Sequence, residues 1–305
     1  MIFRTVNLLF LLVMVNVVPA QTISREYLIF LTDKWTGERF PDGRPKVPDD
    51  VVDRFRDVNI EEAWGVLRNE GYFNQFEGGW QMVHQDVPVV GRAMTAQYMP
   101  DRPDVSDQIK MKGKQDGRIG SPNSWPIDML SKRDVYIADG FGKVNEGTLI
   151  GDNLGNSIYT KSGNGVVFDA GARDLDGLSK IAGFNAFVRG FHPSFIHEVM
   201  LTGLNVPIRI GSVTVLPGDV VLGKREGVLI IPAHMAQQVL EISEVIQFRD
   251  RFAITRLKEG KYTPGQIDTK WTEAIENDFF AWLDTLGKIP ISKTRIKEIF
   301  MKRTW

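Results

Sequence analysis

Three residues at predicted turns, Asp152, Arg173 and Asp174, could bind a metal ion and a small acid. They stand in the glycine-rich blocks 151–155 and 171–174, where predicted strands stop and turns begin. Functional sites are commonly built at such positions. A small-residue turn that opens a helix leaves backbone N–H groups free for the carboxylate of a 2-oxo acid. Arg173 could add a planar guanidinium to the same ligand.

Asp174 is the predicted metal ligand. One protein carboxylate, completed by water and a chelating substrate, is typical of magnesium, and manganese suits the same oxygen ligands. The sequence has no cysteine, which excludes thiolate metal sites, disulfides and a cysteine nucleophile. Taken alone, each feature also has an ordinary explanation, because glycine-rich turns are common and neighbouring arginine and aspartate residues often cap helices or face solvent.

The histidines are a weaker set of candidates. His192, His197 and His234 could be imagined as metal ligands or as a general base. The first two are separated by five positions in a Gly-Phe-His-Pro loop, a spacing that does not favour a shared metal. Histidine is also often only a polar surface group.

The charge balance argues against a nucleic-acid partner. Lys and Arg number 37 against 38 Asp and Glu, which gives a net charge of −1. Such a chain has no bulk attraction to nucleic acid or to an anionic membrane. We therefore expect a small 2-oxo acid as the partner and no nucleic acid.

The elements that position the candidate residues follow an α/β pattern. Predicted strands at 134–138 and 165–169 flank a predicted helix at 151–161. Two earlier segments are expected to be loops: 22–50, which is polar and proline-rich, and 101–120, which is charged and has no clear periodicity. The remaining expected elements are one or two helices over 49–70, strands at 87–98, 186–189, 206–210, 213–215, 219–222 and 227–232, and helices at 233–258, 270–286 and 292–302.

Residues 1–20 are expected to form a cleaved signal peptide. Arg4 precedes an apolar run over 8–18, and small residues end the segment at Ala20. This pattern favours a secreted protein of a bacterial periplasm that is not inserted in the membrane after cleavage. A retained N-terminal anchor is the alternative.

Four blocks resemble the RraA-like family, which includes 4-hydroxy-4-methyl-2-oxoglutarate/4-carboxy-4-hydroxy-2-oxoadipate aldolases. The blocks are 151–154, 165–174, 215–219 and 227–232, and their order and spacing match. Family aldolases carry an aspartate, twenty intervening residues and then Arg-Asp. Here twenty residues separate Asp152 from Arg173-Asp174.

The resemblance implies an α/β fold of the swivelling β/β/α type. We expect an N-terminal extension over 21–48, an RraA-like domain over 49–262 and a C-terminal helical extension over 263–305. The family assembles as a trimer or as a dimer of trimers, so a homotrimer or hexamer with sites at subunit interfaces is expected.

The resemblance also implies roles for single residues. Asp174 would hold Mg²⁺, or Mn²⁺, largely through water, and Asp152 would organise the catalytic water. A carboxylate from the long C-terminal helix of a neighbouring subunit approaches the family's site; Asp250 is the candidate here, while Arg249 and Glu244 compete for the alignment. The groups implied to bind the substrate are Arg173 and the backbone amides of Gly151, Asp152, Asn153 and Leu154.

The implied activity is that of a class II pyruvate aldolase, a carbon–carbon lyase with oxaloacetate decarboxylation as a side activity. A metal that chelates the 2-oxo acid stabilises the pyruvate enolate formed by either cleavage. A non-catalytic binding or regulatory protein of the cell envelope is the alternative, because the family is named for an inhibitor of ribonuclease E. A third possibility keeps the aldolase site but uses it on a periplasmic sugar acid.

Overall fold

Four parallel strands form the centre of the fold. The computed structural model describes residues 21–302, so the expected signal peptide lies outside the described part. Strands β3, β4, β5 and β6 pair in parallel in that order. Parallel strands need crossover connections, and the α/β pattern of the sequence reflects them. The bounds are Val89–Pro100 for β3, Asp134–Thr148 for β4, Val166–Ala172 for β5 and Ala186–Phe191 for β6.

Antiparallel strands extend this sheet on both sides, and the whole has nine strands with the main order β1-β11-β10-β3-β4-β5-β6-β2. β7 pairs with the end of β3, and β8 and β9 form a separate hairpin. The bounds are Phe76–Glu77 for β1, Gln81–Met82 for β2, Val199–Leu204 for β7, Ile208–Ile210 for β8, Val213–Val215 for β9, Val220–Lys224 for β10 and Gly227–Ile231 for β11.

Each face of the sheet is buried by a different partner. Tyr136 and Phe168 point to the face covered by α5 (Trp125–Asp128), α6 (Asp152–Ser162) and α7 (Leu175–Leu178). Val135 and Val167 point to the other face, which the β8–β9 hairpin covers. Because successive side chains of a strand alternate between faces, both faces are apolar and the strands read as continuous hydrophobic runs.

The N-terminal extension is folded onto this domain. Residues 22–50 were expected to form a loop, and this expectation is wrong for α1 (Arg25–Leu31), which Ser24 caps by accepting a hydrogen bond from the Tyr27 N–H. α2 (Asp49–Arg54), a short 3₁₀ helix (Phe55–Asp57) and α3 (Ile60–Asn69) then follow, as the apolar spacing of 49–70 indicates.

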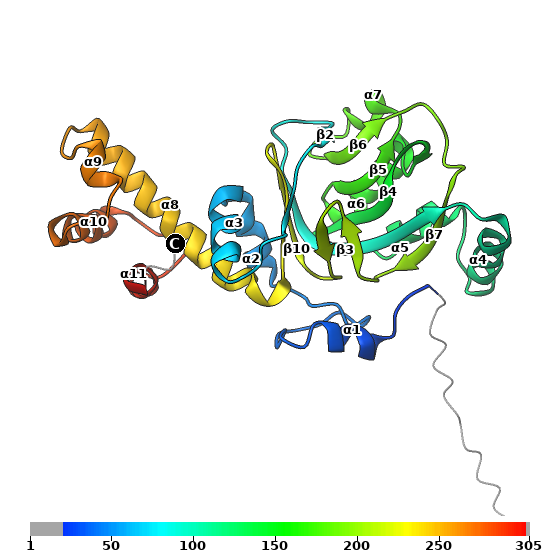
Figure 1. Ribbon diagram of the computed structural model, residues 1–305, viewed down its shortest axis with the longest axis horizontal. Coiled ribbons are helices and arrows are strands. Elements are labelled where there is room, and N and C mark those ends of the chain that lie inside the picture. The colour runs from blue at the N-terminus through cyan, green and yellow to red at the C-terminus, as the bar shows by residue number, and fades with distance from the viewer. Residues whose placement is uncertain (1–20, 303–305) are drawn as a thin grey trace, which may run out of the picture.

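The C-terminal helices leave the sheet as an arm (Figure 1). After a 3₁₀ turn (Ala233–Met235), α8 (Ala236–Lys258) packs its first half against α2 and α3. Its second half is followed by α9 (Pro264–Ile267), α10 (Glu273–Thr285) and α11 (Lys293–Lys302). Phe279 of α10 contacts Phe300 of α11 and Trp271, which lies between α9 and α10. The helices expected at 233–258, 270–286 and 292–302 are confirmed. No helix within residues 21–302 is long and apolar enough to cross a membrane.

The expectation of a loop over 101–120 is also wrong. α4 (Pro103–Gln115) lies there and is followed by a 3₁₀ turn (Pro122–Ser124). The helix has only a weak apolar face, in which Ile109 packs against the core, and its backbone approaches the domain closely at Gly113. A β-carbon at Gly113 would come within 2.2 Å of the Trp125 ring.

Candidate functional site

Two turns bring the predicted residues together. β4 is followed by Gly151, which caps the N-terminus of α6, so Asp152 is the first residue of that helix. β5 ends at Ala172, and Asp174 then adopts a left-handed conformation with φ of 57° at the start of α7. A residue with a β-carbon rarely adopts this conformation, and such strain often marks a functional position.

The two turns are in direct contact. The Arg173 N–H donates to the Ile150 carbonyl oxygen over 3.0 Å, which joins the end of β5 to the turn before α6. A β-carbon built on Gly151 would come within 2.2 Å of the Asp174 Oδ2 atom and 3.3 Å of the Arg173 Nε atom. A larger residue at position 151 would displace the Asp174 side chain from this place. The Asp152 side chain packs closely against Gly177. A β-carbon built on Gly177 would come within 2.7 Å of the Asp152 Oδ2 atom.

The first turn of α6 offers free backbone donors. The Asn153 N–H donates to the Asp152 Oδ1 atom over 2.8 Å, and the Gly155 N–H donates to the Gly151 carbonyl oxygen. Within residues 21–302, no protein acceptor takes the N–H groups of Asp152 and Leu154. Free N–H groups at a helix N-terminus are suited to bind a carboxylate.

A small cavity of about 70 Å³ opens at this place. Arg173 lines it and lies beneath the ring of Phe195, whose centroid is 5.6 Å from the guanidinium carbon. The other residues around the cavity are Asn123, Thr148, Leu149, Ile150, Gly151, Asp152, Asn153, Leu154 and Ile196. The structure therefore gathers all the predicted substrate-binding residues around one cavity, with Asp174 against Gly151 at its edge.

The donor set fits a divalent cation held by one protein carboxylate. The side chain of Asp174 is 36% exposed, and its nearest ionic partner is Arg173, 3.6 Å away, which is longer than a hydrogen bond. Among the described residues, no three carboxylate or imidazole side chains gather closely enough to hold a metal by themselves. A cation at Asp174 would take its remaining ligands from water and a chelating substrate, as magnesium commonly does.

A model of the RraA-like family, described as Aldolase/RraA, matches residues 49–230. The chain belongs to the RraA-like family. The matched region contains both turns of the candidate site, and it ends just before α8.

Individual relatives are more distant. The RraA-like chain is 31% identical over 120 residues to a Halalkalibacterium halodurans protein provisionally named a 4-hydroxy-4-methyl-2-oxoglutarate aldolase, a match that covers 39% of this chain and 56% of the relative. It is 24% identical over 177 residues to protein DlpA of Legionella pneumophila, which covers 58% of this chain and 26% of that protein. The chain thus spans less than two thirds of the length of these relatives.

A solved structure supports the fold. Streptomyces coelicolor RraAS2, described as an unusual member of the RNase ES inhibitor RraA protein family, superposes with a TM-score of 0.60 at 23% identity. The superposition covers 69% of this chain and all of that one. The RraA-like fold is therefore confirmed, with the C-terminal helices as an addition to the mixed sheet.

Asp250 does not join the cavity within its own RraA-like chain. It lies in α8, and burial raises the pKa of its carboxyl. The two residues that compete with it in the alignment have partners elsewhere: Glu244 pairs with Arg54 through two hydrogen bonds, and Arg249 lies 4.9 Å from the Trp271 ring centre. A role for Asp250 in the site of a neighbouring subunit remains a prediction.

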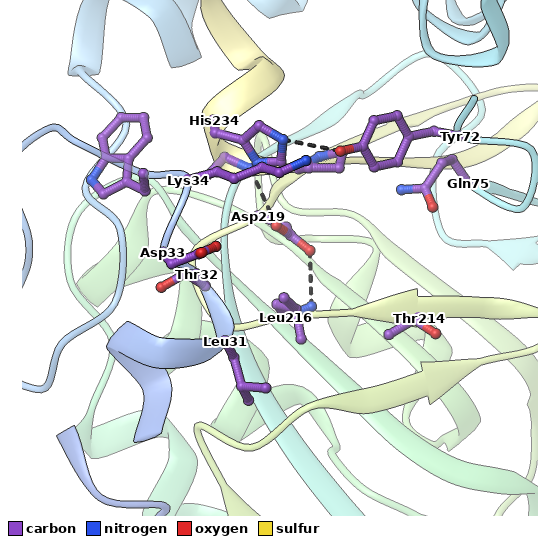
Figure 2. Close-up of a pocket in the computed structure, with 13 residues that line it drawn as sticks. Leu31, Thr32, Asp33, Lys34, Tyr72, Gln75, Thr214, Leu216, Asp219 and His234 are labelled. Carbon is purple, nitrogen blue, oxygen red and sulfur yellow. Dashed lines mark hydrogen bonds between the residues drawn. The ribbon is translucent and has the colours of Figure 1, made fainter. Parts of the chain in front are cut away.

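A second, larger cavity of about 310 Å³ was not anticipated from the sequence (Figure 2). It lies between the N-terminal extension, which contributes Lys34, and the domain, which contributes Tyr72 and His234. The Tyr72 hydroxyl and the His234 Nε2 atom are 3.0 Å apart. Despite its size, this cavity lacks the pairing of an open carboxylate with free helix amides, so we assign the chemistry to the smaller one.

Asp219 lines the second cavity but has a structural function. Its two carboxylate oxygens accept hydrogen bonds from the Leu216 and Ala233 N–H groups, at 2.8 and 3.2 Å (Figure 2). It therefore joins the turn before β10 to the end of β11. Burial raises the pKa of Asp219 to about 7, against the effect of these two hydrogen bonds.

The other histidines have local contacts. His192 accepts a hydrogen bond from the Ser194 N–H through Nδ1, and the His197 ring packs edge-on against Phe195. Phe195, which lines the site cavity, was not anticipated from the sequence. It lies in the loop before β7, and no sequence motif marks it.

Proposed function

We propose that this protein is a divalent-metal-dependent class II aldolase or decarboxylase that cleaves a 2-oxo acid and releases pyruvate. The contact between Gly151 and Asp174 carries the proposal. It places an open carboxylate beside the amides of a helix N-terminus and next to an arginine. The provisional aldolase name of the Halalkalibacterium halodurans relative supports the same reaction class.

Each residue of the site has a part in the proposed reaction. Arg173 and the free amides of Asp152 and Leu154 bind the carboxylate of the 2-oxo acid and orient it. Asp174 would hold Mg²⁺ or Mn²⁺, and the bound ion would supply Lewis-acid chemistry for the 2-oxo group. Asp152 orients a water molecule that takes the proton of the C4 hydroxyl.

The bond changes balance without a further reactant. In the aldol cleavage the C4 hydroxyl loses its proton, the C4 carbonyl forms, and the C3–C4 bond pair becomes the pyruvate enolate. Protonation at C3 then gives pyruvate. Oxaloacetate gives the same enolate when its C3–C4 bond breaks and CO₂ leaves, so decarboxylation is a side activity of the same site.

The assembly and the location belong to the same proposal. We infer a homotrimer or hexamer, so that α8 of one subunit can bring Asp250 to the site of another, and a periplasmic location that follows from the N-terminal segment. Light scattering on the purified protein tests the first, and cell fractionation tests the second.

The activity is tested by measuring pyruvate release from oxaloacetate and from 4-hydroxy-4-methyl-2-oxoglutarate, with Mg²⁺, with Mn²⁺ or with EDTA. We expect release that depends on the metal and stops with EDTA. If neither acid is cleaved with any divalent metal, the lyase proposal is wrong, and a non-catalytic binding role becomes the better account.

A further inference from the structure

The larger cavity, of about 310 Å³, lies at the opposite end of the sheet from the site around Asp174. Asp219 lines it and directly precedes β10, which pairs with β3 near the start of that strand, at Arg92. Arg92 also pairs with Asp134, the first residue of β4. The site around Asp174 follows the other ends of β4 and β5, and the two cavities share none of their described lining residues. The larger cavity is therefore a separate place on the molecule.

One wall of this cavity is the turn after α1, and hydrogen bonds within the N-terminal extension fix that turn. The Arg39 guanidinium donates to the carbonyl oxygens of Thr32 and Trp35, at 2.7 and 3.1 Å, and to the Thr32 hydroxyl at 2.7 Å. Lys34 lies between these two anchored residues. It also precedes residue 49, where the match to the family model begins, so this wall is an addition to the RraA-like domain.

The polar end of the cavity gathers unused hydrogen-bond donors. Lys34 extends toward Tyr72 and His234 (Figure 2), and it has no hydrogen bond or ion pair with any residue of 21–302. Burial and the charge of Lys34 lower the pKa of His234, so its ring is neutral at pH 7. A neutral imidazole and a phenol carry one polar hydrogen each, and the bond between His234 and Tyr72 uses one of the two. The pair therefore keeps one donor for a ligand, beside the ammonium group.

The carboxylates that line the cavity leave these donors unpaired. Both oxygens of Asp219 already accept backbone N–H groups, from Leu216 and Ala233. Asp33 is exposed, and its charge acts on the pKa of His234 less strongly than that of Lys34. A group of donors with a net positive charge and no acceptor suits a carboxylate, which accepts strong hydrogen bonds from an ammonium group.

The rest of the cavity surface is partly apolar. Leu31, Leu216 and Pro232 line it and are half-buried, and we call these three residues the apolar wall. Sites for small molecules are commonly concave and mostly apolar with a few placed polar groups, and about 300 Å³ is the lower end of their range of volumes. The cavity therefore has the size and the surface for a small amphipathic molecule.

We propose that this cavity binds a small organic monocarboxylate, whose carboxylate accepts hydrogen bonds from Lys34 and the Tyr72–His234 pair and whose apolar body lies against the apolar wall. Because the donors come from both the N-terminal extension and the domain, the bound acid also joins these two parts of the chain. The inference goes beyond the proposed lyase function and does not depend on it.

A set of simple acids tests the binding. Calorimetric titration of the full chain in EDTA, which removes any metal from Asp174, measures phenylacetate, hexanoate, phenylacetamide and acetate. We expect phenylacetate or hexanoate to bind with a dissociation constant below about 1 mM. Phenylacetamide, which lacks the charge, and acetate, which lacks the apolar body, should bind at least about tenfold more weakly. Binding of neither larger acid, or equal binding of phenylacetate and its amide, overturns the proposal.

Removal of the ammonium group tests its part. We expect Lys34→Gln to weaken the bound acid about tenfold or more, and Tyr72→Phe to weaken it less, because His234 then keeps its own N–H group. Lys46→Gln is the control, since Lys46 lies in the same extension, pairs with Glu38 and is outside the cavity lining. Unchanged affinity in Lys34→Gln, or an equal loss in Lys46→Gln, contradicts the proposal.

Two further measurements locate the bound acid. Arg173→Gln should retain phenylacetate binding, whereas a loss in that variant with none in Lys34→Gln would place the acid in the other cavity and overturn the inference. Acetylation of Lys34 by acetic anhydride, followed by mass spectrometry, should slow at saturating phenylacetate while that of Lys46 does not, and an unchanged rate at Lys34 contradicts the assignment. None of these readouts needs turnover, so a failure of pyruvate release leaves the inference standing, and a failure here leaves the lyase proposal standing.

Discussion

The Asp174 carboxylate lies against the backbone of Gly151, so closely that a β-carbon at residue 151 would come within 2.2 Å of its Oδ2 atom. The two residues belong to different turns, one at the start of α6 and one before α7. Their contact fixes the distance between the proposed metal ligand and the proposed carboxylate-binding amides.

Gly151→Ala should therefore inactivate the protein without unfolding it. The backbone of Gly151, with φ of −121°, is open to alanine, so the added methyl group displaces the exposed Asp174 side chain instead. A misplacement of about 1 Å can cost about a hundredfold in rate. We expect a loss of that order in kcat/KM for pyruvate release. Gly265→Ala, whose β-carbon would meet nothing within 4 Å, is the control and should keep its activity.

Arg44 should be essential for stability, because it ties the N-terminal extension to the sheet. Its side chain is 3% exposed and pairs with the fully buried Asp134 at 3.2 Å. Removal of one partner from a buried ion pair costs about 3–5 kcal/mol, so Arg44→Ala should lower the free energy of unfolding by that amount in urea titrations. Lys46→Ala removes a far more exposed pair with Glu38 and should cost less than about 1 kcal/mol. Equal effects of the two variants would contradict this account.

Asp219 should make stability depend on pH. Its pKa is about 7 in the folded chain and near 3.8 when unfolded, so between these values the folded state binds the additional proton. The contribution of Asp219 to the free energy of unfolding is therefore largest below about pH 4 and is lost as the pH rises to about 7. We expect the stability difference between wild type and Asp219→Asn to fall over this range. A flat difference in denaturation measured from pH 4.5 to 8 would show that the folded pKa is not raised.

Subunit mixing should reveal whether Asp250 acts across an interface. Asp174→Asn and Asp250→Asn are each expected to be inactive alone. If each site takes Asp174 from one subunit and Asp250 from its neighbour, a random equal mixture restores about a quarter of the sites. Pyruvate release by co-expressed variants measures this. Asp152→Asn mixed with Asp174→Asn should give no rescue, because both residues come from the same chain, and rescue in that control would rule out the assignment.

The sequence predicted the parts of the site that depend on local signals. The glycines around Asp152 and Arg173 mark turns, and the apolar runs beside them mark strands and a helix, as the structure confirms. α4 was missed because its apolar face is weak, and its packing depends largely on the close approach of Gly113 to Trp125.

Phe195 was missed for a related reason. The segment that carries it is positioned by hydrogen bonds to Glu146 and Thr148, which are 48 and 46 residues away from their partner Ser194. The contact of Phe195 with Arg173 arises only when β4, β5 and β6 lie side by side. Local periodicity does not contain that information.

Asp174 is the proposed metal ligand of a pyruvate-releasing lyase, and the most direct test of this role compares Asp174→Asn with Asp176→Asn. Asp176 is an exposed carboxylate two residues further on, in the first turn of α7. The measurement is kcat/KM for pyruvate release from 4-hydroxy-4-methyl-2-oxoglutarate as Mg²⁺ is varied. We predict metal-dependent turnover that Asp174→Asn abolishes and Asp176→Asn preserves. Turnover that survives Asp174→Asn with the same dependence on Mg²⁺ would contradict the account.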